Sequence, residues 1–373
     1  MDYERSLEKS RKKLRDSFGC RFEAHTDISN CFPSIYSHAV AWAAVGFQTA
    51  KAHTGGKHKA LWYNQLDEKL RKTKRNETQG VAIGPATSNI VAELILGKVD
   101  DELRGEFSYV RYIDDYTAYC TSDDQAQRFF RRLSDELAKY KLLLNSKKTE
   151  VRTLPHALTA DWIGELQLRL PKGIALTSSE AINYLNIAVE VAQSAPDGSV
   201  LKYALRTLVN RRLTKSAALD VLEYALTLSF HQPALLPLLE PLLAIASPTA
   251  WLLYSTQLSR IALINAEYRR SDGMAWALYY LSKYQLPISQ DVADKVLESE
   301  DCVALLLLYQ AGNPQHVQRV VQFAQNLIQT GGLYDLDQYW LLLYKLFCDN
   351  AILNPYPNED CFEILSNGGV QFS

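Results

Sequence analysis

Apolar residues recur at helical spacing from about residue 178 to the end of the chain, with no strand pattern in this part of the sequence. Ten helices are predicted, at residues 180–194, 199–213, 216–229, 232–246, 249–265, 274–284, 289–298, 301–312, 315–330 and 336–348. Short breaks that contain Pro, Gly, Ser or Asp separate them. The series favours stacked helical hairpins of irregular repeat length, and an unspecialised helical bundle is equally compatible with it.

The first 160 residues mix helical and strand patterns. Helices are predicted at 2–18, after Pro33, at 61–75, after Thr87 or Ser88, and at 124–140, and strands at 22–28, in a hairpin at 108–120, and at 142–144. This order predicts an α+β fold, in which an antiparallel sheet carries helices on one face.

Three of these helices have a candidate buried face. The positions expected to point inward are Leu7, Leu14 and Phe18 in the first helix, Ile35, Ala39, Trp42 and Ala43 in the second, and Ile90, Val91, Leu94 and Ile95 in the helix after Thr87. Apolar stripes of this kind attach a helix to a sheet or to another helix.

Two carboxylates stand at the predicted tip of the hairpin. The segment 108–120, SYVRYIDDYTAYC, has β-prone runs on both sides of Asp114 and Asp115. Because side chains alternate along a strand, Val110, Tyr112 and Asp114 are expected to share a face. Taken alone, an acidic pair at a turn is most often a solvated turn, so the rest of the chain must decide its role.

Two further segments contain residues that could form one site together with the carboxylates of this hairpin. Asp27 lies near the C-terminal end of a predicted strand, and Gln79–Gly80 precede a predicted helix. Transfer of a nucleotide onto a 3′-hydroxyl uses two divalent ions about 4 Å apart. Carboxylates from two neighbouring strands can hold both ions, since Mg²⁺ keeps waters and phosphate oxygens as its other ligands. The predicted strand order allows Asp27 and Asp114 to meet in this way.

Charge is divided unevenly along the chain, although the net charge is only −2. Residues 1–215 carry 33 Lys and Arg against 26 Asp and Glu, and residues 216–373 carry 7 against 16. Within 51–75 there are eight basic and two acidic residues. A polyanionic partner is therefore expected to meet the first part of the chain, unless the asymmetry is ordinary surface variation.

Composition argues against a membrane or secreted protein. The longest apolar stretches, such as 234–246, contain Pro and Glu and are too short to span a bilayer. The charged start, MDYERSLEKSRKKLRDSFG, lacks the apolar core of a secretory signal. The six cysteines form no CxxC pair and no Cys/His metal spacing, as is usual for reduced thiols in the cytosol. We expect a cytoplasmic protein without structural zinc.

Taken together and in order, the motifs resemble the palm of a reverse transcriptase. TDISNCF resembles the first catalytic motif, QGVAIGPATSN the second, YIDD the aromatic-x-Asp-Asp box, and LNSKKT the fourth motif. The amino-acid sequences DISNCFPSIY and IGPATSNIVAE most resemble those of the bacterial abortive-infection, AbiK-like reverse transcriptases of antiphage defence. These enzymes pair a polymerase with a C-terminal helical-repeat domain, which agrees with the helices predicted after residue 178. The resemblance implies RNA-directed DNA synthesis from dNTPs in the bacterial cytoplasm.

The resemblance also implies a metal site. Asp27 and Asp114 would bind two Mg²⁺ ions, Asp115 would assist them, and the backbone carbonyl of Ile28 would be a further ligand. These residues belong to the first and third motifs.

The substrate residues follow from the same resemblance. Phe32 would lie against the sugar of the incoming nucleotide and exclude a 2′-hydroxyl, which selects dNTPs. Gln79 and Gly80 would lie against the base pair, where Gly allows close backbone approach. Lys148, with Lys147 as the alternative, would neutralise the pyrophosphate, a task suited to a movable point charge. Surface solvation is an equally good interpretation of both lysines.

Three parts of the chain are expected: a palm with truncated fingers at 1–160, a thumb-like helical region at 161–215, and a helical repeat-like domain at 216–373. Only 26 residues precede Asp27, so the usual fingers motifs that grip the triphosphate are missing. A compact version, a fragment of a longer protein and one half of a two-chain system all stay open. Basic residues at 11–15 or in 51–75 could replace the missing grips, although a solvated helix face is the more common role of such residues. In the thumb-like region, a helix bearing Arg206, Arg211, Arg212 and Lys215 could follow the phosphates of a product duplex.

The expected partners are dNTPs, DNA, an RNA template or noncoding RNA, and either a second copy of the chain or a partner polymerase subunit. Two alternatives stay open. The same site could synthesise DNA without a template, on a protein primer, or the palm could be an inactive nucleic-acid-binding scaffold. Measuring dNTP incorporation with and without template distinguishes all three.

Overall fold

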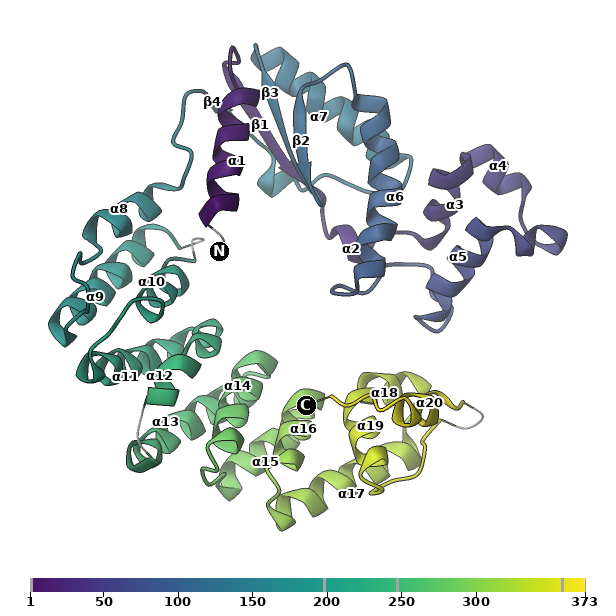
Figure 1. Cartoon of the computed structure of the whole chain (residues 1–373). Helices are drawn as coiled ribbons and strands as arrows, with labels where there is room; N and C mark the ends of the chain where they lie inside the picture. Colours follow the sequence, from purple (N-terminus) through teal and green to yellow (C-terminus); the bar gives the residue numbers. More distant parts are fainter. Residues whose placement is uncertain (1–2, 197–198, 246–247, 357–358, 373) are drawn as a thin grey trace. The chain divides into compact units, whose positions relative to one another are not determined.

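The computed structural model describes residues 3–196, 199–245, 248–356 and 359–372. The chain divides into two compact units, Met1–Leu158 and Thr159–Ser373. The first unit contains a sheet with helices, and the described part of the second is helical, as the predicted α+β fold with a helical C-terminal region requires (Figure 1). In the described parts of the chain, every helix is too short or too polar to span a lipid bilayer.

A four-stranded antiparallel sheet lies at the centre of the first unit. Its strands are β1 (Phe22–Asp27), β2 (Tyr109–Tyr112), β3 (Asp115–Cys120) and β4 (Glu150–Thr153), in the order β2-β3-β1-β4. The hairpin and the first strand are therefore confirmed. The strand predicted at 142–144 is wrong, because Leu144 makes only an isolated bridge to Ile28 and the chain then turns at Asn145 before β4.

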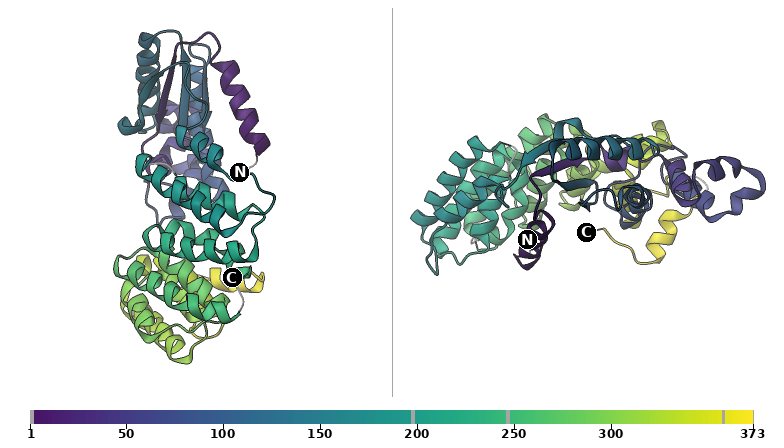
Figure 2. Two further views of the ribbon diagram at one scale, coloured as in Figure 1. Left: turned by 90° about the vertical axis from the view of Figure 1, so that its left-hand side faces the viewer. Right: turned by 90° about the horizontal axis from the view of Figure 1, so that it is seen from above.

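The helices of the first unit surround this sheet and extend away from it (Figures 1 and 2). They are α1 (Tyr3–Asp16), α2 (Cys31–Ser34), α3 (Ser37–Val45), α4 (Phe47–Ala52), α5 (Trp62–Lys72), α6 (Ala86–Leu103) and α7 (Asp123–Ala138), with 3-10 turns η1 (Gly56–Ala60) and η2 (Ser146–Lys148). The helix predicted after Pro33 is divided into α2 and α3, because Ile35 and Tyr36 adopt extended backbone angles.

The two faces of the sheet differ in chemistry. Ala24 and its cross-strand partner Ala118 are fully buried in an apolar core shared with α6 and α7. The alternate residues of β1 are Glu23, His25 and Asp27, which therefore point to the opposite face. Helices α6 and α7 thus cover one face, and the other carries polar groups, of which Glu23 is buried and pairs with Lys13 of α1.

The buried faces predicted for the helices are partly correct. The side chains Ile35, Ala39, Trp42 and Ala43 are all buried, as are Val91 and Ile95. The prediction is wrong for Leu14, Phe18 and Ile90, which are 54%, 90% and 68% exposed, and Leu94 is half-buried. The Leu7 side chain lies outside the described ones. Spacing identified helical positions, but burial also depends on whether another element covers that side of the helix.

The second unit is a succession of helices. They are α8 (Asp161–Arg169), α9 (Ser178–Ser194), α10 (Val200–Val209), α11 (Lys215–His231), η3 (Pro233–Leu238), α12 (Glu240–Ile245), α13 (Pro248–Glu267), α14 (Ser271–Lys283), α15 (Gln290–Ser299), α16 (Cys302–Gln310), α17 (Pro314–Thr330), α18 (Leu333–Gln338), α19 (Trp340–Cys348) and α20 (Cys361–Asn367). The prediction missed α8 and α20, and two predicted helices are each divided in two, at 232–246 and at 336–348.

Each of these helices packs mainly on its near neighbours in sequence. Helix α9 contacts α10 and α11, α13 contacts α14 and α15, and α16 contacts α17 and α19. Side-chain oxygens of Thr177, Thr214, Ser289, Asp301 and Asn313 cap successive helix starts, which sets where each helix begins. This arrangement is that of stacked helical hairpins.

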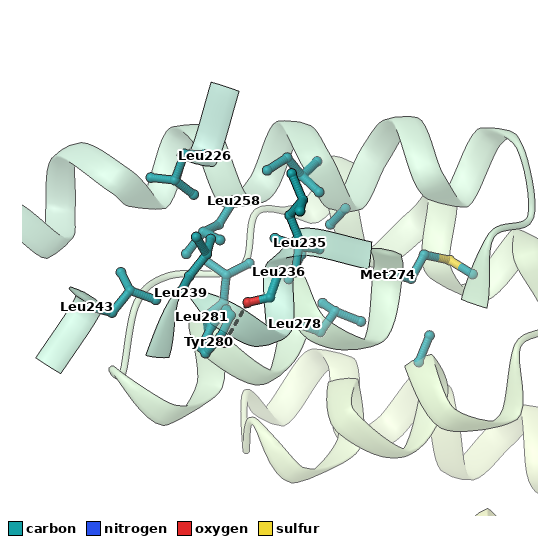
Figure 3. Packing of buried hydrophobic residues seen from close by; sticks show 14 of the residues in the cluster. Leu226, Leu235, Leu236, Leu239, Leu243, Leu258, Met274, Leu278, Tyr280 and Leu281 are labelled. Atoms are coloured by element: carbon teal, nitrogen blue, oxygen red, sulfur yellow. Dashed lines mark hydrogen bonds between the residues drawn. The ribbon is translucent and has the colours of Figure 1, made fainter. Parts of the chain in front are cut away.

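Leucines fill the space between neighbouring helices, as Figure 3 shows around η3. The cluster drawn there includes Leu226, Leu235, Leu236, Leu239, Leu243, Leu258, Leu278 and Leu281. The buried Tyr280 hydroxyl donates a 2.8 Å hydrogen bond to the carbonyl oxygen of Leu236. The large side chain of Tyr280 has one polar atom, its hydroxyl oxygen, and this bond satisfies it inside the apolar cluster.

Gly273 in α14 is expected to be essential for stability. A Cβ at this position would lie 2.2 Å from Cγ of Asn265, whose buried side chain donates a 2.8 Å hydrogen bond to the Ile261 carbonyl. Gly273→Ala should lower the free energy of unfolding by about 2 kcal/mol, the usual cost of overpacking. Denaturant titration measures this change.

Gly164→Ala in α8 is the matched control. A Cβ there meets no atom within 4 Å, so this variant should be neutral or stabilising by about 0.5–1 kcal/mol. Equal stabilities for the two variants would contradict the packing around Asn265.

Candidate active site

Pairing between β1 and β3 brings two distant carboxylates together. In the antiparallel register Asp27 lies directly opposite Asp115, and Thr26 lies opposite Tyr116. Directly opposed side chains point to the same face, with Cβ atoms about 4.5–5.5 Å apart. Asp27 and Asp115 therefore share the polar face of the sheet.

Asp114 lies in the turn of the hairpin rather than in a strand. Strand β2 ends at Tyr112, β3 begins at Asp115, and Ile113 between them has a positive φ of 60°. Strand alternation thus does not extend to Asp114, and the prediction that it shares a face with Val110 and Tyr112 by alternation is wrong. The carbonyl of Asp114 instead accepts a 3.2 Å hydrogen bond from the Ile28 amide, which fixes the turn beside the end of β1.

The carboxylates form a site of concentrated negative charge. Burial, and then the charges of Asp27 and Asp115, raise the pKa of Asp114. Burial together with the charges of Asp114 and Asp27 raises the pKa of the neighbouring Cys31 thiol to about 12. Because the Cys31 thiol is influenced by both carboxylates, the start of α2 lies close to the same site.

Asp27 is buried and only partly satisfied. The residue is 6% exposed, and its Oδ1 atom has no hydrogen-bond partner, although buried carboxylate oxygens are normally paired. Its Oδ2 atom forms an ion pair with the Lys148 ammonium group, and this contact raises the pKa of Lys148. One oxygen of Asp27 is therefore available to a cation.

Residues 143–148 place Lys148, rather than Lys147, against Asp27. Ser29 donates a hydrogen bond to the Leu143 carbonyl, and Asn145 donates one to the Asp27 carbonyl, each 2.8 Å long. The 3-10 turn η2 then carries the Lys148 side chain back to the carboxylate.

The backbone of Ile28 faces the hairpin turn. Its two neighbours in sequence bond to the 143–145 segment, so the Ile28 amide and carbonyl point to the other side, where the amide meets Asp114. The carbonyl thus lies on the side of the chain that faces the hairpin.

This donor set fits Mg²⁺. Among the described residues, no group of three or more His, Cys, Asp and Glu side chains is arranged to enclose a metal ion. Mg²⁺ does not need such a cage, since it is usually held by one or two carboxylates together with waters and substrate phosphates. Asp27, Asp114 and the Ile28 carbonyl, with the unpartnered oxygen of Asp27, provide oxygen donors of that kind.

The second motif is held against the segment that follows Asp27. Gly80 donates to the Ile35 carbonyl at 2.7 Å, Val81 donates to the Phe32 carbonyl at 2.9 Å, and the Gln79 side-chain amide donates to the Ser34 carbonyl at 3.0 Å. Gly80 has a φ of +83°, and a Cβ there would lie 2.9 Å from the Pro33 carbonyl oxygen. Only glycine fits this close approach of two backbones.

The structure thus forms two groups from the predicted site residues. Asp27, Ile28, Asp114, Asp115 and Lys148 gather at the ends of β1 and β3. In the second group, Gln79 and Gly80 donate hydrogen bonds to the carbonyls of Ser34 and Ile35, and the next residue, Val81, donates one to the carbonyl of Phe32. Helix α2, which begins four residues after Asp27, joins this group to the first.

Arg111 was missed by the sequence analysis. Its guanidinium forms a bidentate pair with Glu93 at 2.7 and 2.8 Å, bonds Asp100 at 2.7 and 2.9 Å, and donates to the Ile113 carbonyl at 2.8 Å. The side chain is only 11% exposed. Arg111 therefore ties the hairpin turn to α6. The only signal in the sequence is an arginine inside an otherwise aromatic and aliphatic strand.

The predicted phosphate-binding helix of the second unit is only partly present. Helix α10 carries Arg206 but ends at Val209, so Arg211 and Arg212 lie in the turn before α11, which begins at Lys215. Arg211 donates hydrogen bonds to the carbonyls of Pro171 and Gly173, so this side chain supports the local fold.

Comparison with known families identifies the chain. Residues 1–189 match the family described as "Reverse transcriptase (RNA-dependent DNA polymerase)". The chain belongs to the reverse transcriptase family. This match includes the reverse transcriptase motifs at Asp27, Gln79–Gly80 and Asp114–Asp115.

Other comparisons add less about this reverse transcriptase. No curated protein matches the chain. Among solved structures it is similar to an apo telomerase from Candida tropicalis, with 12% sequence identity and a TM-score of 0.31 over 90% of this chain. The chain spans 55% of that telomerase.

Proposed function

We propose that this protein is an RNA-directed DNA polymerase that adds dNTPs to a primer 3′-hydroxyl with two Mg²⁺ ions. The observation that carries the proposal is the pairing of Asp27 with Asp115 beside the Asp114 turn. Membership of the reverse transcriptase family supports the same reaction.

In the proposed reaction the 3′-oxygen attacks the α-phosphorus of the dNTP, and the bond from that phosphorus to the pyrophosphate oxygen breaks. Asp27, Asp114 and the Ile28 carbonyl would hold the metals, with assistance from Asp115. Bound Mg²⁺ would lower the pKa of the attacking hydroxyl and stabilise charge on the leaving group. Lys148, exposed and movable, would leave Asp27 and neutralise or protonate the pyrophosphate.

The second group of residues would hold the nucleotide. Gln79 and Gly80 would contact the base pair. Because the packing at position 80 leaves no room for a side chain, Gly80 would offer its backbone to the base pair. Phe32, half-buried at the start of α2, would lie against the sugar.

Replacing Phe32 by Ala should relax sugar selection. If the ring excludes a 2′-hydroxyl, its loss should raise the ratio of rNTP to dNTP incorporation efficiency by about 10- to 100-fold, a range typical of a pocket that rejects added atoms. Single-nucleotide incorporation with matched rNTP and dNTP measures the ratio. Phe47→Ala serves as the control, because that exposed aromatic lies on α4. If the ratio of rNTP to dNTP incorporation were unchanged in Phe32→Ala, Phe32 would not lie against the sugar.

The polymerase proposal is tested with purified full chain, labelled dNTPs and Mg²⁺. Incorporation on a primed RNA template that EDTA abolishes is the expected result. Incorporation without any template, in a product that enters the aqueous phase only after protease treatment, would instead indicate protein-primed synthesis. No incorporation under any condition would favour the non-catalytic scaffold.

A role in antiphage defence is part of the proposal. It is supported by the likeness of the DISNCFPSIY and IGPATSNIVAE segments to AbiK-like enzymes and by the helical series that follows the polymerase. A second copy of the chain or a partner polymerase subunit is part of the same proposal, as the likeness to this group of enzymes implies. All six cysteines are free, which agrees with the proposed cytoplasmic location.

A further inference from the structure

A cavity of about 430 Å³ lies among α3, α4, η1 and α5, the part of the first unit drawn away from the sheet in Figure 1. None of the proposed catalytic or substrate residues lines it. Its volume is within the range of sites for small ligands, about 300–1,000 Å³. Its wall combines His38 and buried Trp42 of α3 with charged side chains from three further elements, α4, η1 and α5.

A buried carboxylate organises one wall of this cavity. Asp67 of α5 is 7% exposed. Its Oδ2 atom accepts a 2.7 Å hydrogen bond from Nδ1 of His38, and its Oδ1 atom lies 3.4 Å from Nε of Arg71. Oδ2 of Asp67 thus holds Nδ1 of His38, whereas its Oδ1 atom and Nε of Arg71 are paired by charge alone and are buried without a hydrogen-bond partner. Nε2 of His38 and the guanidinium of Arg71 remain for other partners. Both side chains are part of the cavity wall.

Other elements add further cations to the wall. Lys51 of α4 lies 5.8 Å from the centre of the Trp42 ring, and Lys59 comes from η1. The second acidic residue of the wall, Glu68, forms a 2.8 Å ion pair with Lys72, which is not part of it. After these pairs are taken into account, the wall has an excess of positive charge from Lys51 and Lys59.

We propose that this cavity binds a nucleotide through its phosphate group. Arginine and lysine side chains that converge from several elements are the usual partners of phosphate oxygens, and arginine binds them through paired N–H groups. The half-buried His53 ring, which stacks on His58, also lines the cavity and supplies aromatic surface for the base, whereas Trp42 is buried within the wall. This site is separate from the proposed polymerase site and does not depend on its activity.

The cavity wall is connected directly to the second motif. Asn76, another wall residue, donates a 2.8 Å hydrogen bond to the Arg71 carbonyl, and the Lys74 ammonium between them donates to the Gln79 carbonyl. A ligand that fixes Arg71 therefore also restrains the segment that leads to Gln79. Slower amide exchange of Gly80 and Val81 is expected when the ligand binds.

Calorimetric titration of the full chain with AMP in EDTA tests the proposal, because removal of divalent ions suppresses metal-dependent binding at the polymerase site. Wild type and Asp114→Asn should bind AMP equally. Arg71→Ala and Lys51→Ala should each weaken binding at least about ten-fold, the loss expected for one charge-assisted contact. Lys51 is exposed, so its variant should fold even if Arg71→Ala does not.

Lys69→Ala is the matched control, since Lys69 is exposed on α5 and lies outside the cavity wall. Its affinity for AMP should equal that of the wild type. Equal weakening in Lys69→Ala and Lys51→Ala, or no binding of AMP by the wild type at millimolar concentration, would overturn the proposal. Binding of an oligonucleotide without terminal phosphate, but not of AMP, would also overturn it, because the site would then hold a strand phosphate.

Discussion

Asp114→Asn is expected to abolish nucleotide addition while leaving the protein folded and at least as stable. Loss of a metal-holding carboxylate removes several kcal/mol of transition-state stabilisation, which corresponds to a decrease in rate of about 10³-fold or more. The same substitution removes a half-buried charge. Burial and the charges of Asp27 and Asp115 raise the pKa of Asp114, so at neutral pH its ionised form opposes folding in the absence of metal.

The sign of the stability effect follows from that shift. A carboxyl group with a raised pKa in the folded state binds its proton more tightly when folded, so stability falls as pH rises above the unfolded pKa. The neutral Asn does not have this cost. In EDTA at pH 7, Asp114→Asn should therefore have a melting temperature equal to or above that of the wild type.

Asp124→Asn, in the exposed first turn of α7, is the control. It should change neither dNTP incorporation nor its dependence on Mg²⁺. Asp27→Asn should lose incorporation as Asp114→Asn does. If Asp114→Asn or Asp27→Asn retained dNTP incorporation, the substituted carboxylate would not belong to the catalytic centre.

Arg111→Ala is expected to damage both folding and catalysis, although Arg111 is a positioning residue and touches no substrate in the proposed reaction. Its removal leaves the half-buried Asp100 without its cation, and loss of one partner of a buried ion pair costs about 3 kcal/mol. The Ile113 carbonyl also loses its donor. A displacement of Asp114 by about 1 Å would lower the rate about 10²-fold.

Two measurements separate misplacement from simple unfolding. At a temperature where circular dichroism shows Arg111→Ala to be folded, kcat should fall while KM for the dNTP changes little, and half-maximal activity should need more Mg²⁺. Arg111→Lys should restore part of the stability but little of the rate, because lysine cannot make the bidentate pair with Glu93. Arg128→Ala, an exposed arginine that pairs with Glu106, should be close to wild type. Normal kcat in folded Arg111→Ala would show that α6 does not position the turn.

The order of motifs made much of this arrangement predictable. A β-prone run before Asp27 and two such runs around Asp114–Asp115 defined three strands, and hairpin geometry required two of them to pair. Periodicity likewise identified most helices of the second unit, because each buries a stripe against near neighbours in sequence. Local patterns therefore sufficed where the contacts themselves are local.

The motifs predicted that Asp27 and the hairpin meet and favoured Lys148, but local patterns did not provide the register and the side-chain partners between distant segments. The register that sets Asp27 opposite Asp115 depends on packing of the whole sheet, and the choice of Lys148 over Lys147 depends on the η2 turn. The partners of Arg111 lie on a helix that precedes it in sequence, so no local pattern relates them. Phe18 fits a helical stripe by spacing, yet it is 90% exposed.

The edge strand β4 has a consequence for how the protein behaves at high concentration. It lies at one end of the sheet and is only four residues long, with the exposed, oppositely charged Glu150 and Arg152 paired on it. Short, charged edge strands resist pairing with the edge of another molecule. Replacing both side chains by Val would leave a β-prone, uncharged edge. The palm would then self-associate through that strand, and its solubility would fall.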